Sequence, residues 1–218
     1  MKRLHITTLG CKVNQYESAA IMEQMRLLGW EPVPKSDPVD LCIINTCTVT
    51  QKASMQSRQA IRQAIKSHPK AVIIVTGCYA QVAPEEIAAI AGIHYTIGHF
   101  QKPRIAKIAN KIKHGDLPKV EVQNLKSPLP FQDMPVTDFA KRSRPLLKIQ
   151  DGCDAFCAYC IVPYARGRSR SLPPDILLKR IKAMSDKGYR EVVLTGIHLG
   201  HYGFDLTPAT NLLQILKN

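Results

Sequence analysis

The chain has 218 residues, of which 45% are hydrophobic and 22% charged, as in a globular protein of one large or two small domains. Its formal net charge of +13 predicts attraction to a polyanion, with nucleic acid first, an anionic membrane second and an acidic protein third. No run of about 18 apolar residues or signal-peptide core is present, so neither a membrane span nor secretion is expected. The seven cysteines are therefore expected in a reducing cytoplasm, as metal ligands rather than disulfides.

The first 113 residues alternate predicted strands with predicted helices. The expected strands are 4–9, 40–45, 71–76 and 93–97. The expected helices are 15–28, 50–67, 84–92 and 103–113, and Asn14 is expected to cap the first of them. This alternation predicts an α/β domain with a parallel, Rossmann-like sheet over residues 1–113.

Three cysteines follow the ends of successive predicted strands. They are Cys11, Cys47 and Cys78. In a parallel sheet these strand ends share one edge, where open α/β folds bind ligands, so the three thiols are expected to meet at a joint metal site. The alternative for each is a tight turn that buries a small residue. Cys42 lies inside a predicted strand and is expected to be a buried structural thiol.

The second half of the chain is organised around the loop from Asp151 to Ile161. Residues 114–144 are polar and proline-rich and are predicted to be an interdomain linker, followed by a domain over 145–218 that opens with a strand at 146–150. The loop then places Cys153, Cys157 and Cys160 at Cys-x3-Cys-x2-Cys spacing. The usual zinc patterns do not have this spacing, whereas three ligands on a four-iron cube leave one iron open for chemistry.

Three arginines at alternate positions follow this loop. Arg166, Arg168 and Arg170 are expected in an extended segment suited to phosphate contact, the alternative being a solvated basic loop. A predicted helix then reaches about residue 187, a strand at 191–195 ends in Gly196, and another helix starts at 210. Two strand–helix units are fewer than a (β/α) barrel requires, so the sequence predicts the truncated start of a partial barrel that is poorly active or inactive alone.

Several of these segments resemble one known family. Residues 148–163 are similar to the cluster loop of radical S-adenosylmethionine (SAM) enzymes, and more closely to the methylthiotransferase branch. The segments around Cys11, Cys47 and Cys78 resemble the three signatures of that branch's N-terminal domain. The resemblance implies one [4Fe-4S] cluster on each set of three cysteines. It also implies Tyr159 against the adenine of SAM and Gly196 near its methionine portion, while His198 is expected to pack or to contact substrate.

The segment after the first cysteine, residues 12–18, resembles MtaB-type enzymes of this family. These enzymes act on N6-threonylcarbamoyladenosine beside the tRNA anticodon. The resemblance therefore implies a cytoplasmic tRNA-modifying transferase that adds a methylthio group to C2 of this base. In this reading SAM and the first cluster activate the C–H bond, which side-chain acids and bases cannot do. The second cluster carries the sulfur. The expected partners are a tRNA anticodon loop and an electron donor such as a flavodoxin or ferredoxin.

Three alternatives remain open from the sequence. The substrate could be another tRNA adenosine, or it could be a ribosomal-protein side chain. A third hypothesis is a non-catalytic metal- and RNA-binding module in which the thiols hold zinc structurally. Iron and sulfide content separates this module from the enzyme, and salt-sensitive tRNA binding would speak against the protein substrate.

Overall fold

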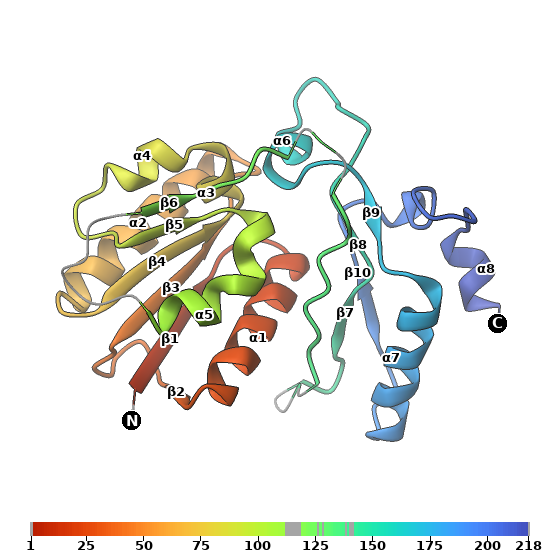
Figure 1. Cartoon of the computed structure of the whole chain (residues 1–218), viewed down its shortest axis with the longest axis horizontal. Coiled ribbons are helices and arrows are strands. Elements are labelled where there is room, and N and C mark those ends of the chain that lie inside the picture. Colours follow the sequence, from red (N-terminus) through yellow and green to blue (C-terminus); the bar gives the residue numbers. More distant parts are fainter. Residues whose placement is uncertain are drawn as a thin grey trace. The chain divides into compact units, whose positions relative to one another are not determined.

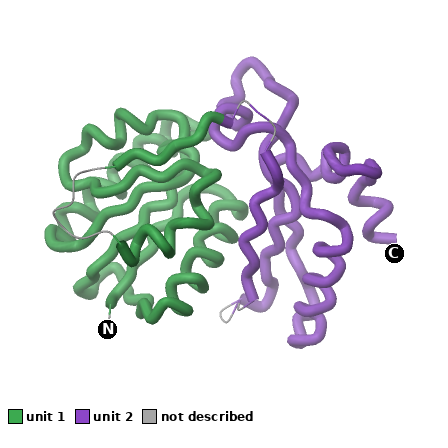
Figure 2. Tube along the Cα trace, viewed as in Figure 1, with its two compact units in different colours: residues 1–124 green, residues 125–218 purple. Residues whose placement is uncertain are grey.

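The chain forms two compact units, residues 1–124 and residues 125–218 (Figure 2). The computed structural model describes residues 2–111, 119–125, 127, 129–137, 139 and 142–217. The expected helix end at 113 and the linker residues 114–118 lie outside these ranges. In the described part of the chain, no helix is both long and apolar enough to cross a membrane.

Unit 1 is built on a six-stranded sheet in the order β2-β1-β3-β4-β5-β6, with every neighbouring pair parallel (Figure 1). The strands are β1 (Lys2–Thr8), β2 (Trp30–Pro32), β3 (Leu41–Thr46), β4 (Val72–Gly77), β5 (Tyr95–Ile97) and β6 (Lys119–Glu121). Every residue of β3 and β4 is buried, as expected for central strands of a parallel sheet covered on both faces. The parallel α/β fold predicted from the sequence is confirmed.

Helices connect these strands. They are α1 (Lys12–Leu27), α2 (Gln51–Ser67), α3 (Cys78–Val82), α4 (Pro84–Ala88), the 3-10 helix η1 (His99–Arg104) and α5 (Ile105–Ala109). The side of α2 that carries Ile61 and Ala64 is buried in a core cluster with Ile44, Ile73 and Val75 of the two central strands. This burial orients α2 and leaves its opposite side exposed to solvent.

Three details of unit 1 differ from the sequence-based expectations. Part of the predicted linker, Lys119–Glu121, is a sheet strand that pairs with β5, and β2 is an additional strand at the opposite edge. Three-residue edge strands are too short to show periodicity, and Pro32 is tolerated at an edge because it need not donate a ladder hydrogen bond. The predicted helix over 103–113 begins instead as η1 at His99.

The cap of the first helix was also predicted wrongly. Cys11 occupies the N-cap position of α1 without a side-chain capping hydrogen bond, and Asn14 lies within the helix, completely buried. By contrast, Thr50 caps α2 by accepting a hydrogen bond from the Ala53 amide. Asn14 therefore does not cap the helix, and its side chain bonds a distant part of the chain instead.

Unit 2 contains the beginning of a parallel strand–helix arrangement. Strand β7 (Leu146–Lys148) pairs in parallel with β10 (Val193–Thr195), and α7 (Pro174–Asp186) lies between them in the sequence. A second pair, β8 (Gln150–Asp151) with β9 (Arg170–Ser171), is antiparallel. The remaining helices are α6 (Val162–Arg166), the 3-10 helix η2 (Leu199–His201) and α8 (Leu212–Leu216). The β7–α7–β10 order is the expected strand–helix–strand unit.

Cys42 is buried within β3, as the sequence predicts, and burial raises the pKa of its thiol from 9.0 to about 11. Between these values the folded state binds the thiol proton more tightly than the unfolded state does. The free energy of unfolding should therefore fall as pH rises from about 9 to about 11. We expect Cys42→Ala to remove this component of the pH dependence. The small cavity should also lower the free energy of unfolding by an amount that does not depend on pH. Urea unfolding across this pH range checks the prediction. If the free energy of unfolding changes with pH in the same way in the wild-type protein and in Cys42→Ala, the prediction is wrong.

Candidate metal centres

The three cysteines of unit 1 lie at one edge of its sheet. Strands β1, β3 and β4 are neighbours in that order, and Cys11, Cys47 and Cys78 each follow the C-terminal part of one of them. The parallel register aligns Thr8 with Asn45 and continues to Thr46 with Gly77, so the three cysteine turns leave the sheet at nearly the same level. None of these three cysteines forms a disulfide, and Cys11 is exposed whereas the other two are buried. The structure thus brings together the strand ends that carry the predicted ligands.

Two glycines allow these turns to approach one another. Gly10 has a φ of +91°, and a Cβ built on it would lie 2.8 Å from both the Cβ and the Sγ of Cys47. Gly77 has a φ of +101°, and its Cβ would lie 2.3 Å from the carbonyl oxygen of Thr46. Glycine is therefore required at both places by conformation and by space. The glycines before Cys11 and Cys78 thus allow neighbouring turns at this edge of the sheet to pack closely.

Buried hydrogen bonds tie the three turns into one frame. The Asn14 amide donates to the carbonyl oxygens of Leu9 (2.7 Å) and Thr46 (2.9 Å), which joins the first turn to the second. The Thr46 hydroxyl donates to the carbonyl oxygen of Thr76 at 2.6 Å, which joins the second turn to the third. The hydroxyl of Ser57 on α2 accepts from the amide of Cys47 and donates to its carbonyl oxygen.

The polar residues in the segment that follows Cys11 also make buried contacts within unit 1. Besides Asn14, Glu17 forms a completely buried ion pair with Lys102 of η1. The Ser18 hydroxyl accepts a hydrogen bond from the Asn45 amide at 2.9 Å. Sequence reasoning missed these roles. The sequence feature that indicated these roles is the occurrence of polar residues on the same side of helix α1 as its apolar core positions.

Backbone hydrogen bonds fix the start and the last turn of the cysteine loop of unit 2. The Cys153 amide donates to the carbonyl oxygen of Gly167 (3.0 Å), and the Cys160 amide to that of Cys157 (2.9 Å). Gly152 has a φ of +72°, and a Cβ on it would lie 2.0 Å from the carbonyl oxygen of Arg168. Cys157 is exposed, and Cys153 and Cys160 are partly buried. The three cysteines are therefore at least partly accessible to solvent, whereas the backbone at Gly152, just before the first of them, is tightly packed.

Tyr159 projects into solvent with 92% of its surface exposed. It lies immediately before Cys160 in the loop, so it is available to a molecule bound beside the cysteines. Its expected contact with the adenine of SAM stays a prediction.

Gln150 connects this loop to the segment that follows β10. Its Nε2 donates to the carbonyl oxygen of Gly152 (2.8 Å), while its Oε1 accepts from the amides of Ile197 and His198 (both 2.8 Å). A Cβ on Gly196 would lie 2.9 Å from the Gln150 side chain, so glycine is needed for this approach. The predicted SAM-binding position Gly196 is thus tied to the cysteine loop by a residue that sequence reasoning missed.

An aromatic series extends from the first loop cysteine. The Nδ1 of His198 lies 3.8 Å from the Sγ of Cys153. The His198 ring stacks on His201 with centroids 3.7 Å apart, and His201 stacks on Phe204 at 5.4 Å. Phe204 is 64% exposed. The spacing of three residues between successive rings was the available sequence signal. Stacked rings of this kind are typical surfaces for a nucleobase.

The alternating arginines are not the extended phosphate-binding segment that was expected. Arg166 ends α6 and Arg170 lies in β9, and their side chains are 1% and 7% exposed. Both guanidinium groups face the buried carboxylate of Asp151, at 2.8 Å and 3.6 Å, and Lys148 approaches the same carboxylate at 3.3 Å. Only Arg168 of the three arginines is substantially exposed, at 52%. The buried pairing arises because an ionised carboxylate inside a protein needs cationic partners.

The Asp151 carboxylate also accepts a hydrogen bond from the amide of Gly152 at 2.9 Å. It therefore links the buried cations directly to the start of the cysteine loop. Arg166 and Arg170 position this loop, and Arg168 is the arginine still available to a ligand.

The chemistry of the two cysteine sets fits iron–sulfur clusters. In the described ranges, no three or more cysteine, histidine or carboxylate side chains are grouped to hold a single metal ion. Each thiolate of a four-iron cube binds a different iron, so cluster ligands are spread more widely than ligands of one ion. Each of the two sets offers three cysteine side chains outside disulfides, on turns fixed by glycines and hydrogen bonds, as ligands of this kind.

Two family models match the chain. Residues 3–98 match the "Uncharacterized protein family UPF0004", and residues 147–205 match the "Radical SAM superfamily". The first match covers Cys11, Cys47 and Cys78 and the strands that precede them. The second covers the loop with Cys153 and the segment around Gly196.

Similar proteins have tRNA methylthiotransferase names. "Threonylcarbamoyladenosine tRNA methylthiotransferase MtaB" of Bacillus subtilis is 42% identical over 91% of this chain and 44% of its own length. The protein of the same name from Aquifex aeolicus is 38% identical over 95% of this chain and 52% of its own length. "tRNA-2-methylthio-N(6)-dimethylallyladenosine synthase" of Moorella thermoacetica is 31% identical over 99% and 50%, respectively. The chain thus spans about half the length of these relatives.

A solved structure shares the fold at low sequence identity. The radical S-adenosylmethionine methyltransferase TsrM from Kitasatospora setae aligns with a TM-score of 0.56 and 13% identity, covering 90% of this chain and 48% of that one. At this identity the match supports the fold alone. The two family models and the methylthiotransferase relatives together support the assignment of this chain as a fragment of the radical SAM methylthiotransferase type.

Proposed function

We propose that this chain supplies the two cluster sites of a tRNA methylthiotransferase that acts on N6-threonylcarbamoyladenosine next to the anticodon. The observation that carries the proposal is the presence of two separate sets of three cysteines outside disulfides, each on turns fixed by close glycine contacts. Two distinct clusters are what the reaction needs, since one serves SAM and the other serves the sulfur. The net charge of +13 is suited to a tRNA partner.

In this proposal Cys153, Cys157 and Cys160 hold the cluster that binds SAM, and Cys11, Cys47 and Cys78 hold the auxiliary cluster. When bound, these groups supply one-electron cleavage of SAM and a methylated sulfur for an unreactive carbon, chemistry that side chains do not provide. The reductant is a small electron-transfer protein such as a flavodoxin or ferredoxin. The base is reached in a single-stranded loop, where it can be turned outward without breaking a duplex.

The chain's own residues orient these components. Gln150 holds the cysteine loop against the segment after β10 through hydrogen bonds on both sides. Gly196 allows the close approach of Gln150, and its backbone is the proposed contact for the methionine portion of SAM. Tyr159 is exposed beside the loop and supplies a flat surface for the adenine. His201 and Phe204 extend the aromatic surface away from Cys153, where a nucleobase can stack.

The choice of threonylcarbamoyladenosine rests on similarity. The B. subtilis and A. aeolicus relatives named for this nucleoside are 42% and 38% identical to the chain, whereas the M. thermoacetica relative named for the dimethylallyl nucleoside is 31% identical. All three alignments cover at least 90% of the chain. The same comparison makes another modified tRNA adenosine the nearest alternative substrate.

Nucleoside mass spectrometry tests the substrate directly. We expect this chain, within a polypeptide extended to the full length of its relatives and with both clusters reconstituted, to add a methylthio group to tRNA that carries N6-threonylcarbamoyladenosine during anaerobic incubation with SAM and a reductant. Matched tRNA with an isopentenyl group or with plain adenosine at that position should yield at most traces. Preferential modification of the isopentenylated tRNA would contradict the substrate assignment. Incorporation into ribosomal protein with no change in tRNA would contradict the tRNA proposal altogether.

A further inference from the structure

Helix α2 concentrates positive charge on its exposed side. Its 17 residues include Lys52, Arg58, Arg62 and Lys66 and no acidic residue. Arg58, Arg62 and Lys66 are spaced four residues apart, so they form a row with steps of about 6 Å along the helix. Like charges at this spacing destabilise a helix. Their mutual repulsion therefore gives helix α2 no stability that would explain this spacing.

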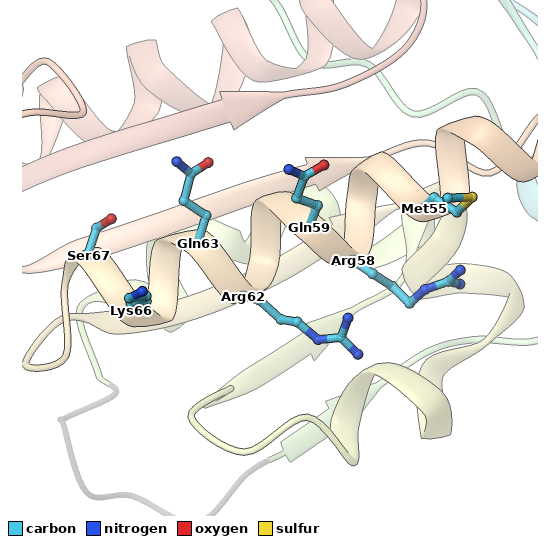
Figure 3. Close-up of a pocket in the computed structure, with 7 residues that line it drawn as sticks. All are labelled: Met55, Arg58, Gln59, Arg62, Gln63, Lys66 and Ser67. Atoms are coloured by element: carbon cyan, nitrogen blue, oxygen red, sulfur yellow. The ribbon is translucent and has the colours of Figure 1, made fainter.

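The same side of α2 borders an open groove of about 860 Å³. The three cations of the row line it, together with Gln59 and Gln63. Figure 3 shows Arg58 and Arg62 extending from one side of the helix axis and Gln59 and Gln63 from the other. The groove thus combines a row of cations with amides that can both donate and accept hydrogen bonds.

This groove is connected to the turns of the auxiliary cysteines. The Arg58 guanidinium donates to the Tyr79 hydroxyl at 2.7 Å, and Tyr79 is the residue after Cys78. On the opposite side of the helix, Ser57 holds the backbone of Cys47. A chain lying along α2 would therefore lead to the edge of the sheet where the reaction is proposed to take place.

Arg58 is the anchored member of the row. Besides its hydrogen bond to Tyr79, it forms an ion pair with Glu86 at 3.4 Å, and its side chain is 31% exposed. Arg62 and Lys66 are exposed to solvent. These two cations are consequently the ones positioned to meet a ligand.

The lining favours an RNA backbone over a protein surface. Protein interfaces are usually centred on aromatic or aliphatic anchors, but in the described helix α2 the exposed large hydrophobic side chain is Met55, near the cysteine end. Regularly spaced cations neutralise phosphates, and glutamine amides can bind ribose hydroxyls. We infer that the groove along α2 binds the phosphate–ribose backbone of the RNA substrate. This inference rests on the proposed function for the identity of that RNA.

The test is the double charge reversal Arg62→Glu/Lys66→Glu in the otherwise intact, reconstituted protein. The matched control is Lys107→Glu/Lys111→Glu, which makes the same charge change at two exposed positions of unit 1. The probe is a synthetic anticodon stem-loop RNA titrated at several salt concentrations. We expect the α2 variant to weaken binding by about tenfold or more. The slope of log Kd against log salt should fall by about 1.5 to 2, as for two lost phosphate contacts.

The control should weaken binding by no more than about threefold, because it changes only the overall field. Equal weakening by both variants, or an unchanged salt slope in the α2 variant, would overturn the inference. Loss of flavodoxin binding at unchanged RNA affinity would also overturn it and assign the groove to an acidic protein. Thermal melting and iron content confirm that both variants are folded and loaded.

The nucleoside assay separates this inference from the proposed function. If the full-length polypeptide with the wild-type sequence of this chain produces no methylthiolated tRNA but the α2 variant loses RNA affinity, the groove is an RNA site and the proposed reaction is wrong. If the wild-type protein is active and the α2 variant binds RNA normally, the reaction stands and the groove inference is wrong.

Discussion

Replacing Cys153, Cys157 and Cys160 together by alanine is expected to lower the iron content from about eight to about four atoms per chain after anaerobic reconstitution. The reason is that the auxiliary cysteines belong to unit 1, whose hydrogen-bonded frame is independent of the loop in unit 2. Cleavage of SAM to 5′-deoxyadenosine should disappear with these four irons. Iron and sulfide analysis, with chromatographic detection of 5′-deoxyadenosine, measures both effects.

The reciprocal variant supplies the matched control. Alanine at Cys11, Cys47 and Cys78 should also remove about four irons, but should leave SAM cleavage in place. Cys42→Ala should retain about eight, because that thiol lies inside a buried strand. Zinc in place of iron in the wild-type protein would support the non-catalytic RNA-binding module instead. Loss of all iron in either triple variant would show that the two sites are not independent.

Asp151→Asn is expected to have the largest effect on stability. The substitution keeps the shape of the side chain but leaves Lys148, Arg166 and Arg170 buried around a neutral group. Removing one partner of a buried ion pair costs about 3–5 kcal/mol, since the buried cations lose the attraction of the carboxylate charge. Because the Asp151 carboxylate also accepts from the Gly152 amide, the cysteine loop should loosen as well. Urea unfolding, followed by iron content of the purified variant, measures both effects.

Asp154→Asn serves as the control for this prediction. Asp154 faces Arg168 at 3.5 Å, but the two side chains are 40% and 52% exposed, so the pair is screened by water. Its loss should cost less than about 1 kcal/mol. The double variant Asp151→Asn/Arg166→Met should recover part of the stability lost in Asp151→Asn, because one of the buried cations that faced the carboxylate is removed with it. Equal, small losses for both single variants would mean that water reaches the buried cations.

Much of unit 1 could be predicted from local sequence. The central strands β3 and β4 are short apolar runs ended by turn residues, and such runs are buried on both faces in a parallel sheet. Once these strands are parallel and adjacent, cysteines placed just after them must share an edge. The position of Cys11, Cys47 and Cys78 at one edge therefore followed from strand pattern alone, as did the buried environment of Cys42.

Other features depended on partners far away in the chain. Asn14 was expected to act locally as a cap, but its amide bonds the carbonyl oxygen of Thr46, 32 residues away. Arg166 and Arg170 were expected in solvent, yet both face Asp151.

The sequence by itself determined the order of strands and helices, the two groups of three cysteines and the family resemblance. These depend on periodicity, turn residues and spacing, which are local. Only the tertiary structure decided which polar side chains are buried and which charges they compensate. Burial of a charged or polar group depends on the partner that satisfies it, and that partner is brought close only when the chain folds.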